Sequence, residues 1–386
     1  MPQTALVAVR SDIRVDPRVR RQIDWLTSEG WTVDTIGMGE VPDGVRDHFA
    51  LRPQAAWTTG KLGRAVMHAT LPDRAKFGIL IARRVAPEAV KRIRRGDYDL
   101  IVFNDIDFAA WVADRSIFTP EALQAHVHLD LHEWFPPHLP PGSRLRIRVD
   151  SYHGWLRSFI GHDAYTTRST VAGGIADAYA EEFGFPRPDV IRNAPSYLDQ
   201  KPSPVGDDRV RLIHHGVAQW QRGLREVVDA MRLLDHGFDM TFMLAGSPAV
   251  IDELTSIAAD VADRVHIVPP APMAELSRVV NQYDLEVMFY PPLNENLKWA
   301  LPNKLFEAVQ GRLGLVIGPS PMMAEIIEEY GNGVMATGWK PEELAAAISS
   351  LTPARVRELK AASDRAAHDL SAEHERDAFL RVVGLR

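Results

Sequence analysis

The chain has 386 residues, more than one ordinary hydrophobic core accommodates, so we expect two domains. With 46% hydrophobic and 25% charged residues and a formal net charge of −7, the composition is that of a soluble globular protein, and no apolar run reaches membrane-spanning length. The absence of cysteine excludes disulfides, zinc–thiolate sites, iron–sulfur clusters and a cysteine nucleophile. The N-terminus meets Arg10 too early for a signal peptide, so we expect a cytoplasmic protein.

Strand-like and helix-like segments alternate through the first half of the chain. Residues 18–30 carry apolar side chains at Val19, Ile23 and Leu26 and end at Gly30, a pattern typical of an amphipathic helix. Short apolar runs predict strands at 4–9, 31–38, 100–105, 126–133, 164–169 and 189–193. A proline-rich stretch at 193–208 then indicates a linker.

The second half repeats the alternation with strands that are almost continuously apolar. Such strands, separated by helices, indicate a parallel sheet covered on both faces. We therefore predict an α/β protein with two Rossmann-like β/α/β domains facing each other across a cleft, over residues 1–195 and 205–368. A C-terminal helix near 370–386 is expected to return to the first domain. Ligands of such folds bind beyond the carboxyl ends of the strands.

The stretch "HHGVAQWQRGL", residues 214–224, directly follows a predicted strand. Gly216 lets a ligand approach the backbone, while Arg222 and Gly223 lie near a helix start that offers a cation and free amides to a phosphate. The stretch matches neither G-x-G-x-x-G nor a P-loop, so NAD and ATP binding lose their sharpest support. The alternative is an ordinary turn with a surface arginine.

A second candidate for phosphate binding is "ALPNKLFEAVQGRLGLVIG", residues 300–318. Pro302 suits the first turn of a helix and Gly311 suits a left-handed end. Lys304, next to Asn303 in the first turn, opposes the helix dipole unless an anion binds there. Lys304 and Glu307 alternatively form a surface ion pair. Taken together, the two stretches supply two cations and two helix N-termini to one crevice, an arrangement that complements a diphosphate. The carboxylate of Glu307 nearby suits hydrogen bonding to a ribose diol.

Polar residues of the first half follow predicted strands and would face the same crevice. His132 suits a hydrogen-bond donor, a general base or a sugar contact, and Glu133 an acid/base group or a cap. The alternative for His132 is a satisfied structural histidine. Asp105 and Asp107 have the D-x-D spacing of a metal-dependent site, although a cap or turn is favoured, so no metal site is predicted.

Two further features of the first half carry charge. Asp16 is expected to cap the first helix, with Pro17 at its first position, and Arg18 is placed to reach an acceptor phosphate or carboxylate. The segment Lys61–Arg95 is basic with interleaved apolar residues, which suits peripheral contact with an anionic membrane or a phosphorylated acceptor. A solvated helical face beside a core stripe is the alternative.

Nearly the whole chain resembles GT-B glycosyltransferases of the large retaining group often called family 4, or glycosyl transferases group 1. The resemblance is specific in the second half and looser in the first. The similar segments, in family order, are "RVDPRVRRQIDWLTSEGWTVDTI", "LDLHEWFPP", "RLIHHGVAQWQRGLREVVDAM", "MLAGSP", "VHIVPPAPMAELSRVVNQYDLEVMFYPP" and "NENLKWALPNKLFEAVQGRLGLVIG".

The resemblance implies a role for several of these residues. It implies that Glu307 binds the ribose of a nucleotide diphosphate sugar and that Arg222 and Lys304 hold the diphosphate. The backbone at Gly216 and at Leu305 would assist, and the loop containing Pro270 would border the base. His132 matches a histidine that contacts the transferred sugar. These enzymes usually need no divalent metal, and no other cofactor is expected.

Two positions depart from the family pattern. The family often has a second glutamate eight residues before the ribose-binding one, where this chain has Trp299. The Gly-Gly loop of many members after the first strand is replaced by "SDIR". The first departure concerns sugar contacts and the second concerns the acceptor.

The resemblance therefore implies a metal-independent, retaining glycosyltransferase of hexosyltransferase type (EC 2.4). Its donor would be a nucleotide diphosphate sugar and its acceptor a glycan, a lipid-linked molecule or a small molecule; no nucleic-acid partner is expected. The protein would be cytoplasmic, with peripheral contact at the inner membrane face through Lys61–Arg95. The alternatives are an NDP-sugar epimerase or hydrolase on the same fold, and a non-catalytic nucleotide-sugar-binding protein.

Overall fold

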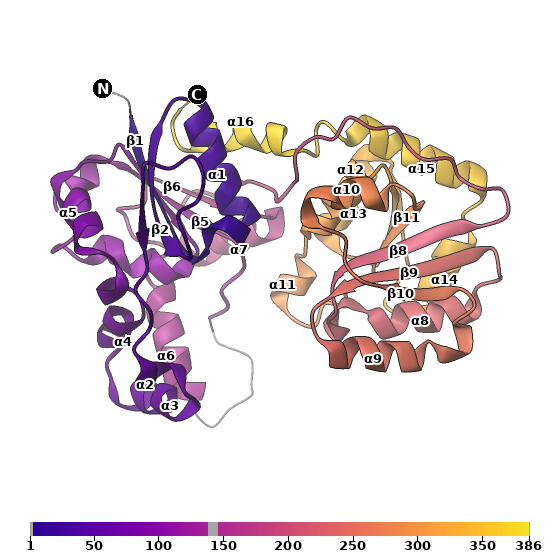
Figure 1. The fold of residues 1–386 in the computed structure, drawn as a ribbon, viewed down its shortest axis with the longest axis horizontal. Helices are drawn as coiled ribbons and strands as arrows, with labels where there is room; N and C mark the ends of the chain where they lie inside the picture. Colours follow the sequence, from indigo (N-terminus) through magenta and orange to yellow (C-terminus); the bar gives the residue numbers. More distant parts are fainter. Residues whose placement is uncertain (1–2, 138–145, 386) are drawn as a thin grey trace. The chain divides into compact units, whose positions relative to one another are not determined.

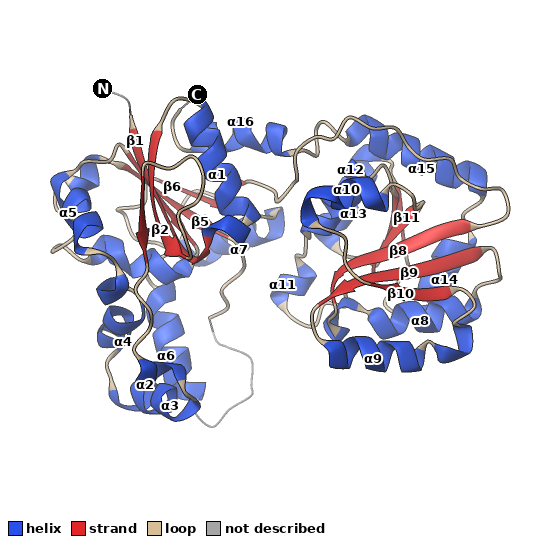
Figure 2. Cartoon of the chain, viewed as in Figure 1, coloured by secondary structure: helices blue, strands red, loops and turns tan. Residues whose placement is uncertain are grey.

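In the computed structural model the chain divides into two compact units. The structure describes residues 3–137 and 146–385, and the side chains of 146–150 are not described. Unit 1 runs to Ile191 and takes in the C-terminal segment from Arg376, whereas unit 2 spans Arg192–Glu375. Each unit is a parallel sheet flanked by helices (Figures 1 and 2). The predicted α/β class with two Rossmann-like domains is confirmed.

Unit 1 contains a seven-stranded sheet of order β3-β2-β1-β4-β5-β6-β7, in which every neighbouring pair is parallel. Its strands are β1 (Thr4–Asp12), β2 (Thr32–Met38), β3 (Asp47–Ala50), β4 (Leu100–Asn104), β5 (His126–Leu131), β6 (Thr167–Thr170) and β7 (Asp189–Val190). Its α-helices are α1 (Pro17–Ser28), α2 (Ala56–Thr59), α3 (Lys61–Thr70), α4 (Asp73–Leu80), α5 (Pro87–Arg95), α6 (Arg146–Arg157) and α7 (Gly173–Phe183).

The C-terminal helix α16 (Ala372–Val382) ends within unit 1. The rings of Phe379 on α16 and Trp25 on α1 lie 5.4 Å apart, and Arg376 pairs with Glu29 just after α1. These contacts bury an apolar side chain and pair a charged one, so the last helix is part of the unit 1 core although it follows all of unit 2 in sequence.

Unit 2 contains a six-stranded parallel sheet of order β10-β9-β8-β11-β12-β13. Its strands are β8 (Val210–Val217), β9 (Phe238–Ala245), β10 (Val265–Val268), β11 (Leu285–Met288), β12 (Gly314–Ile317) and β13 (Gly333–Met335). Its α-helices are α8 (Leu224–Leu233), α9 (Pro248–Ile257), α10 (Leu276–Val280), α11 (Glu295–Lys298), α12 (Asn303–Gln310), α13 (Pro321–Tyr330), α14 (Pro341–Ser349) and α15 (Pro353–Ala366).

The apolar core of unit 2 lies on both faces of its sheet, because successive strand residues point to opposite sides. Leu212 of β8 belongs to a cluster with Val228 of α8 and Leu344 of α14, whereas the next residue, Ile213, belongs to a cluster with Leu305 of α12. From β8 the chain first adds strands on one side and then, from β11, on the other. The carboxyl ends of β8 and β11 therefore flank the topological switch point, where open parallel sheets bind ligands.

The end of α12 differs from the expectation. Gly311 has φ −72°, and Arg312 takes the left-handed conformation with φ 62°. Gly311 is required instead by packing, since a Cβ there would lie 2.5 Å from Val280. The buried Arg312 guanidinium donates to Asp364 (2.7 Å) and to the Leu198 carbonyl (2.6 Å), and these bonds hold its unusual backbone. Pro302 precedes the helix as its N-cap.

The stretch predicted as a linker packs on unit 2. The Gln200 amide donates to the carbonyls of Ser277 (3.0 Å) and Gln310 (2.6 Å), and Ala194 is fully buried in one of the unit 2 clusters. The prolines correctly indicate irregular backbone in this stretch, but specific hydrogen bonds hold that backbone against unit 2. None of the helices in the described ranges combines the length and apolar character needed to cross a bilayer.

Candidate functional site

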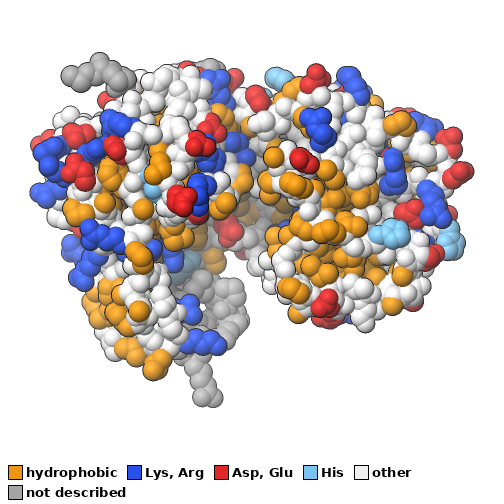
Figure 3. Space-filling model, viewed as in Figure 1, with side chains coloured by type: hydrophobic (Ala, Val, Ile, Leu, Met, Phe, Trp, Pro, Cys, Tyr) orange, Lys and Arg blue, Asp and Glu red, His pale blue; other side chains and the backbone are white. Residues whose placement is uncertain are grey.

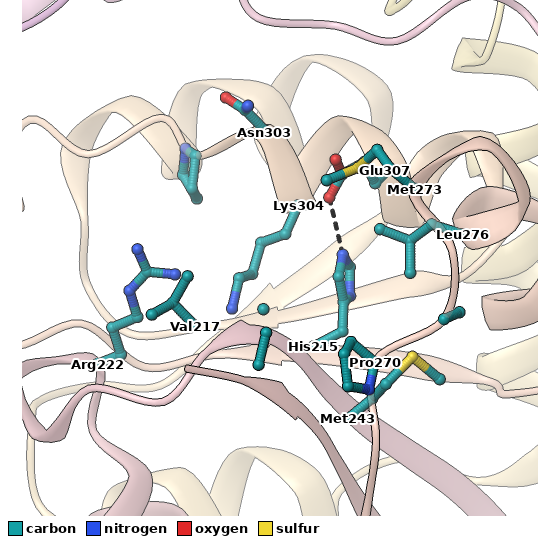
Figure 4. Close-up of a pocket in the computed structure, with 14 residues that line it drawn as sticks. His215, Val217, Arg222, Met243, Pro270, Met273, Leu276, Asn303, Lys304 and Glu307 are labelled. Carbon is teal, nitrogen blue, oxygen red and sulfur yellow. Dashed lines mark hydrogen bonds and ion pairs between the residues drawn. The ribbon is translucent and has the colours of Figure 1, made fainter. Parts of the chain in front are cut away.

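A cavity of about 410 Å³ lies at the switch point of unit 2, between the end of β8 and the start of α12 (Figure 4). Both stretches singled out in the sequence, 214–224 and 300–318, contribute to its wall. The lining residues are His215, Gly216, Val217, Arg222, Met243, Ala245, Pro270, Ala271, Met273, Leu276, Pro302, Asn303, Lys304 and Glu307.

Arg222 and Lys304 converge on the backbone of Gly216. A Cβ built on Gly216 would lie 3.1 Å from Nζ of Lys304 and 3.4 Å from Nη1 of Arg222, and Figure 4 shows both cations directed into the same space. Gly216 has φ 125°, a conformation that L side chains rarely adopt. Glycine is therefore required here for two reasons: the backbone conformation, and access to the space between the cations.

Lys304 is 4% exposed and is held by the buried His214. His214 must donate from Nδ1 to the Val287 carbonyl (2.8 Å), because a carbonyl oxygen only accepts. In the neutral ring Nε2 is then an acceptor, and Nζ of Lys304 donates to it at 3.1 Å. Burial, reinforced by the Lys304 charge, lowers the pKa of His214 well below its usual range and keeps the ring neutral.

Neither cation of the pair is neutralised by an ion pair among the residues the structure describes. Arg222 donates from Nε to the Gln219 side chain (3.2 Å), and the described hydrogen bond of Lys304 is to His214 (3.1 Å). Burial, reinforced by the neighbouring Arg222 charge, lowers the pKa of Lys304 to about 7, although the carboxylates of Glu286 and Glu307 oppose this change. A site with two adjacent basic groups, neither held in an ion pair among the described residues, favours an anionic ligand of more than one charge.

The aromatic ring of Tyr290 lies beneath these cations. It follows β11 and is 3% exposed, with Nζ of Lys304 5.5 Å and Cζ of Arg222 5.9 Å from its centroid. Cation–π attraction of this kind contributes about 0.5–2 kcal/mol and requires no formal negative charge. The ring thus attracts both cations without neutralising their charge.

Glu307 lies on the same face of α12 but bonds to a different histidine. Its Oε2 is 2.9 Å from Nε2 of His215, and Nδ1 of His215 is 2.8 Å from Oε2 of Glu286 on β11. The surface ion pair between Lys304 and Glu307 that the sequence left open is therefore not formed. Burial alone would lower the pKa of His215, but the two carboxylates outweigh it and raise the pKa to about 9, so His215 is an imidazolium at neutral pH.

The end of the cavity away from Arg222 is apolar. Met243, Pro270, Met273 and Leu276 line it. A flat, largely apolar group such as a nucleobase fits such a wall, which offers contact area without charge. The cavity thus combines a cationic end, a carboxylate and an apolar end.

Two predicted donor-site residues lie outside the cavity wall. Gly223 is the N-cap of α8 with φ 68°, and a Cβ there would lie 2.0 Å from the Phe289 carbonyl oxygen, so its role is close packing. Leu305 is fully buried in the core, and its N–H already donates to the Pro302 carbonyl at 3.0 Å. The expectation that the Leu305 backbone contacts a diphosphate is thus not supported by this arrangement. Pro270 and Asn303 do line the cavity.

In unit 1, His132 follows β5 and is held between two carboxylates. Its Nδ1 lies 3.2 Å from Asp105, and its Nε2 lies 3.4 Å from Asp130 and 3.0 Å from Oδ1 of Asn104. Burial lowers the pKa of His132, but these two carboxylates outweigh the effect and the net shift is upward. Because both ring nitrogens face oxygen atoms of Asp105, Asp130 and Asn104, neither is directed at a ligand as a proton acceptor in this arrangement.

Arg18 occupies a structural position instead of the predicted acceptor-binding one. The residue is 5% exposed, and its guanidinium forms two 2.6 Å bonds to Asp130 and donates to the Ile191 carbonyl at 2.7 Å. Burial raises the pKa of Asp130, but Arg18 and His132 overcome this and hold it well below its usual range. Arg18 therefore neutralises a buried aspartate and is not directed at a ligand.

The remaining polar residues of unit 1 have mixed outcomes. Asp16 caps α1 as predicted, accepting from the Val19 N–H at 3.2 Å. It also lines a cavity of about 280 Å³ with Ser11, Asp105 and Asp107, at the carboxyl ends of β1 and β4. Glu133 is exposed, and only its backbone carbonyl has a described bond, from the Tyr179 hydroxyl at 2.9 Å.

The aspartates with D-x-D spacing are committed to other partners. Asp105 accepts from the His132 N–H at 3.0 Å and faces its ring, while Asp107 pairs with Arg10 at 3.0 Å. Within the described ranges no group of three or more histidine, aspartate or glutamate side chains is arranged to hold a metal ion. Trp299, the departure from the family pattern, follows α11 and does not line the unit 2 cavity.

Sequence reasoning missed three residues that shape the site: His214, His215 and Glu286. The two histidines stood in a stretch already singled out, and a pair of histidines at the end of an apolar strand was the available signal. Glu286 interrupts the apolar run of β11 and is fully buried, which was a second signal.

The comparisons with known proteins agree with this geometry. Residues 209–353 match the family model described as glycosyl transferases group 1. This segment is a group 1 glycosyltransferase domain. The matched segment covers β8 to α14 and contains every residue that lines the cavity of unit 2. The chain therefore carries a domain of the glycosyltransferase class of enzymes. No curated protein matches the chain in sequence.

Solved structures with the same two-domain fold cover nearly the whole chain. A sucrose-phosphate synthase from Thermosynechococcus elongatus matches with TM-score 0.68 and 15% identity over 98% of both chains. An α,α-trehalose-phosphate synthase (UDP-forming) from Burkholderia vietnamiensis matches with TM-score 0.66 and 12% identity over 99% of both. The E. coli structure described as trehalose-6-phosphate bound with UDP-2-fluoro glucose matches with TM-score 0.62 and 10% identity, also over 99% of both. The glycosyltransferase domain therefore belongs to a chain of GT-B fold.

Proposed function

We propose that this protein transfers a sugar from a nucleotide diphosphate sugar to an acceptor hydroxyl, with retention of anomeric configuration and without a metal ion. The observation that carries the proposal is the convergence of Arg222 and Lys304 on Gly216 at the switch point of a group 1 glycosyltransferase domain. The neighbouring E. coli structure is bound with UDP-2-fluoro glucose, which supports a nucleotide sugar as the donor class.

The cavity suggests a role for each of its ends. The diphosphate would lie between Arg222 and Lys304, the ribose at Glu307, and the base against Pro270 and Met273. As the bond to the sugar breaks, negative charge grows on the departing diphosphate. Cations already oriented towards that position stabilise this charge without reorganisation, which is commonly the largest catalytic term. They would thus supply the charge that a divalent metal supplies in other transferases.

The acceptor would bind in unit 1. The cavity of about 280 Å³ beside Ser11 and Asp16 offers hydrogen-bond acceptors for hydroxyl groups at the carboxyl ends of β1 and β4. His132 lies in the same polar network through Asp105, and a hydrogen-bonding ring at this position suits contact with the transferred sugar. A glycan, a lipid-linked molecule or a small molecule remains the proposed acceptor class.

Peripheral membrane contact through the segment Lys61–Arg95 is part of the proposal. In this segment Leu62 and Val66 on α3 are 80% and 48% exposed, with Lys61 and Arg64 beside them in the sequence, and Trp57 on α2, just before the segment, is 49% exposed. Figure 3 shows hydrophobic side chains gathered on these helices. Exposed apolar groups with adjacent cations are typical of surfaces that bind anionic bilayers. Binding to vesicles containing phosphatidylglycerol, but not to phosphatidylcholine vesicles, would support this part.

The decisive experiment is a thermal-shift and turnover screen with UDP-, GDP-, ADP- and dTDP-sugars. A ligand at about 100 times its Kd stabilises the fold by roughly 2.7 kcal/mol, so binding is visible before the acceptor is known. Transfer to an acceptor from a glycan and lipid panel, with product anomers assigned by NMR, tests the chemistry. Rapid donor consumption without acceptor would instead indicate a hydrolase or epimerase, and binding without turnover a nucleotide-sugar-binding protein.

A further inference from the structure

Glu286 is a buried carboxylate that the proposed function leaves without a role. It lies on β11 between Leu285 and Val287, is fully buried, and does not line the donor cavity. A charged side chain inside a parallel strand is strongly disfavoured unless specific partners compensate it. Its position therefore requires an explanation that apolar packing does not give.

The partner of Glu286 is His215, which it holds by two contacts. Oε1 of Glu286 accepts from the His215 backbone N–H at 3.2 Å, and Oε2 accepts from Nδ1 of the ring at 2.8 Å. A side chain bonded at both its backbone and its ring has one orientation available. That orientation directs Nε2 of His215 to Oε2 of Glu307 at 2.9 Å.

The three side chains thus form a line from the sheet interior to the cavity wall. His215 is 2% exposed in its side chain, whereas Glu307 is 14% exposed and lines the cavity. The ring engages one oxygen of Glu307 and leaves Oε1 for a ligand. Glu307 stands on a helix and would otherwise rotate freely about its side-chain bonds, so a fixed donor on one oxygen restricts where the other can lie.

We propose that His215, held by Glu286, is a positioning residue that orients the Glu307 carboxylate to accept hydrogen bonds from the ribose hydroxyls of the donor nucleotide. The proposal rests on the proposed function, since it assumes that Glu307 meets the ribose. It adds that ribose recognition depends on two residues that do not touch the nucleotide. A purely structural role for the pair would affect stability but not the discrimination between ribose and deoxyribose.

The test is the ratio of affinities for a nucleoside diphosphate and its deoxy analogue. Calorimetry would compare UDP and GDP with their 2′-deoxy and 3′-deoxy forms, using the full chain. A hydrogen bond from a hydroxyl to a charged carboxylate is strong, so we expect the wild-type protein to bind the ribose form about 10- to 100-fold more tightly. In His215→Gln and Glu286→Gln proteins this ratio should fall to about 3-fold or less.

Two controls keep the result interpretable. Arg222→Ala should weaken binding of the ribose and deoxy forms equally, because its partner is the diphosphate, and leave the ratio unchanged. If His215→Gln leaves Glu286 unpaired and fails to fold, the double variant His215→Leu with Glu286→Met removes both charges together, which buried pairs often tolerate. That variant should also lose the discrimination.

The outcomes separate the two proposals. If wild-type protein discriminates and the folded variants discriminate equally, the positioning role is overturned while the donor site stands. If wild-type protein binds neither UDP nor GDP, nor any other nucleoside diphosphate, the proposed function fails and the positioning role with it. If wild-type protein binds ribose and deoxy forms equally, Glu307 does not meet the ribose, and the positioning role is again overturned.

Discussion

Nζ of Lys304 lies 3.1 Å from Nε2 of His214, and the opposite ring nitrogen of His214 donates to the Val287 carbonyl at 2.8 Å. A neutral histidine therefore holds a buried lysine by hydrogen bonding, without neutralising its charge. The arrangement places a basic group at the switch point where an anion can bind. Burying its charge lowers the free energy of unfolding, and a bound anion would offset this loss.

Replacing Lys304 by methionine should abolish nucleoside diphosphate binding and stabilise the protein at low pH. The folded-state pKa of Lys304, about 7, lies below its ordinary value of 10.5, so the cost of burying the charge is fully present below pH 7 and fades as pH rises towards 10.5. We expect Lys304→Met to gain about 1–4 kcal/mol over wild type at pH 6 and clearly less at pH 9.5, measured by denaturant unfolding.

Lys298→Met is the matched control for that experiment. Lys298 is 49% exposed in its side chain, pairs with Glu295 at 3.3 Å and lies 5.0 Å from the centroid of the Trp299 ring. Its replacement should change stability by no more than about 0.5 kcal/mol at either pH and leave binding intact. An equal stability change for Lys304→Met at both pH values would contradict the buried-charge explanation.

Binding of a nucleoside diphosphate should be accompanied by proton uptake at pH 8. With a pKa of about 7, Lys304 is mostly neutral at this pH in the empty site, and a bound diphosphate would restore its charge. His215, whose pKa is raised to about 9, stays largely protonated and contributes little. Calorimetry in buffers of different ionisation enthalpy should give an uptake close to one proton. Uptake near zero would mean that Lys304 does not meet the diphosphate.

Gly216→Ala should weaken nucleoside diphosphate binding by about 10-fold or more. Its Cβ would fall 3.1 Å from Nζ of Lys304 and 3.4 Å from Nη1 of Arg222, in the space assigned to the diphosphate. Gly331→Ala is the control, because Gly331 also has a positive φ, 66°, but no neighbour within 4 Å of the added carbon. Equal binding losses in the two variants would assign the effect to backbone strain alone.

His132→Gln should lower the transfer rate by roughly 10²-fold and leave the Kd for nucleoside diphosphates within about 2-fold of wild type. The reason is location: His132 belongs to unit 1, whereas all residues lining the donor cavity belong to unit 2. His236→Gln, on an 80% exposed side chain, is the control and should change neither value. A large change in Kd would contradict the separation of donor and acceptor sites.

Transfer should be unaffected by EDTA. Asp105 is engaged by His132 and Asp107 by Arg10, so the aspartates with metal-type spacing already have partners, and Arg222 and Lys304 supply positive charge to the diphosphate. The measurement is the initial rate after dialysis against EDTA, with Mg²⁺ and Mn²⁺ added back separately. A loss restored by either ion would overturn metal independence.

The sequence by itself predicted the α/β class, the repeated unit and the position of most strands, because buried parallel strands are apolar almost without interruption. It also singled out Gly216, Arg222, Lys304 and Glu307, since glycine and cations at strand ends and helix starts are local signals. The N-cap at Asp16 was predictable for the same reason: capping involves residues three apart.

Only the tertiary structure decided which partner each charged side chain takes. From the sequence, Lys304 and Glu307, three residues apart, could form an ion pair with each other. In the structure each instead bonds to a histidine of β8 about 90 residues away. The strand order explains this, because it places β8 beside β11 and under α12. Arg18 likewise forms an ion pair with Asp130, 112 residues away. Spacing along a helix fixes which side chains are neighbours on its surface, but in the interior the arrangement of strands determines which charges meet, and hence which groups remain for a ligand.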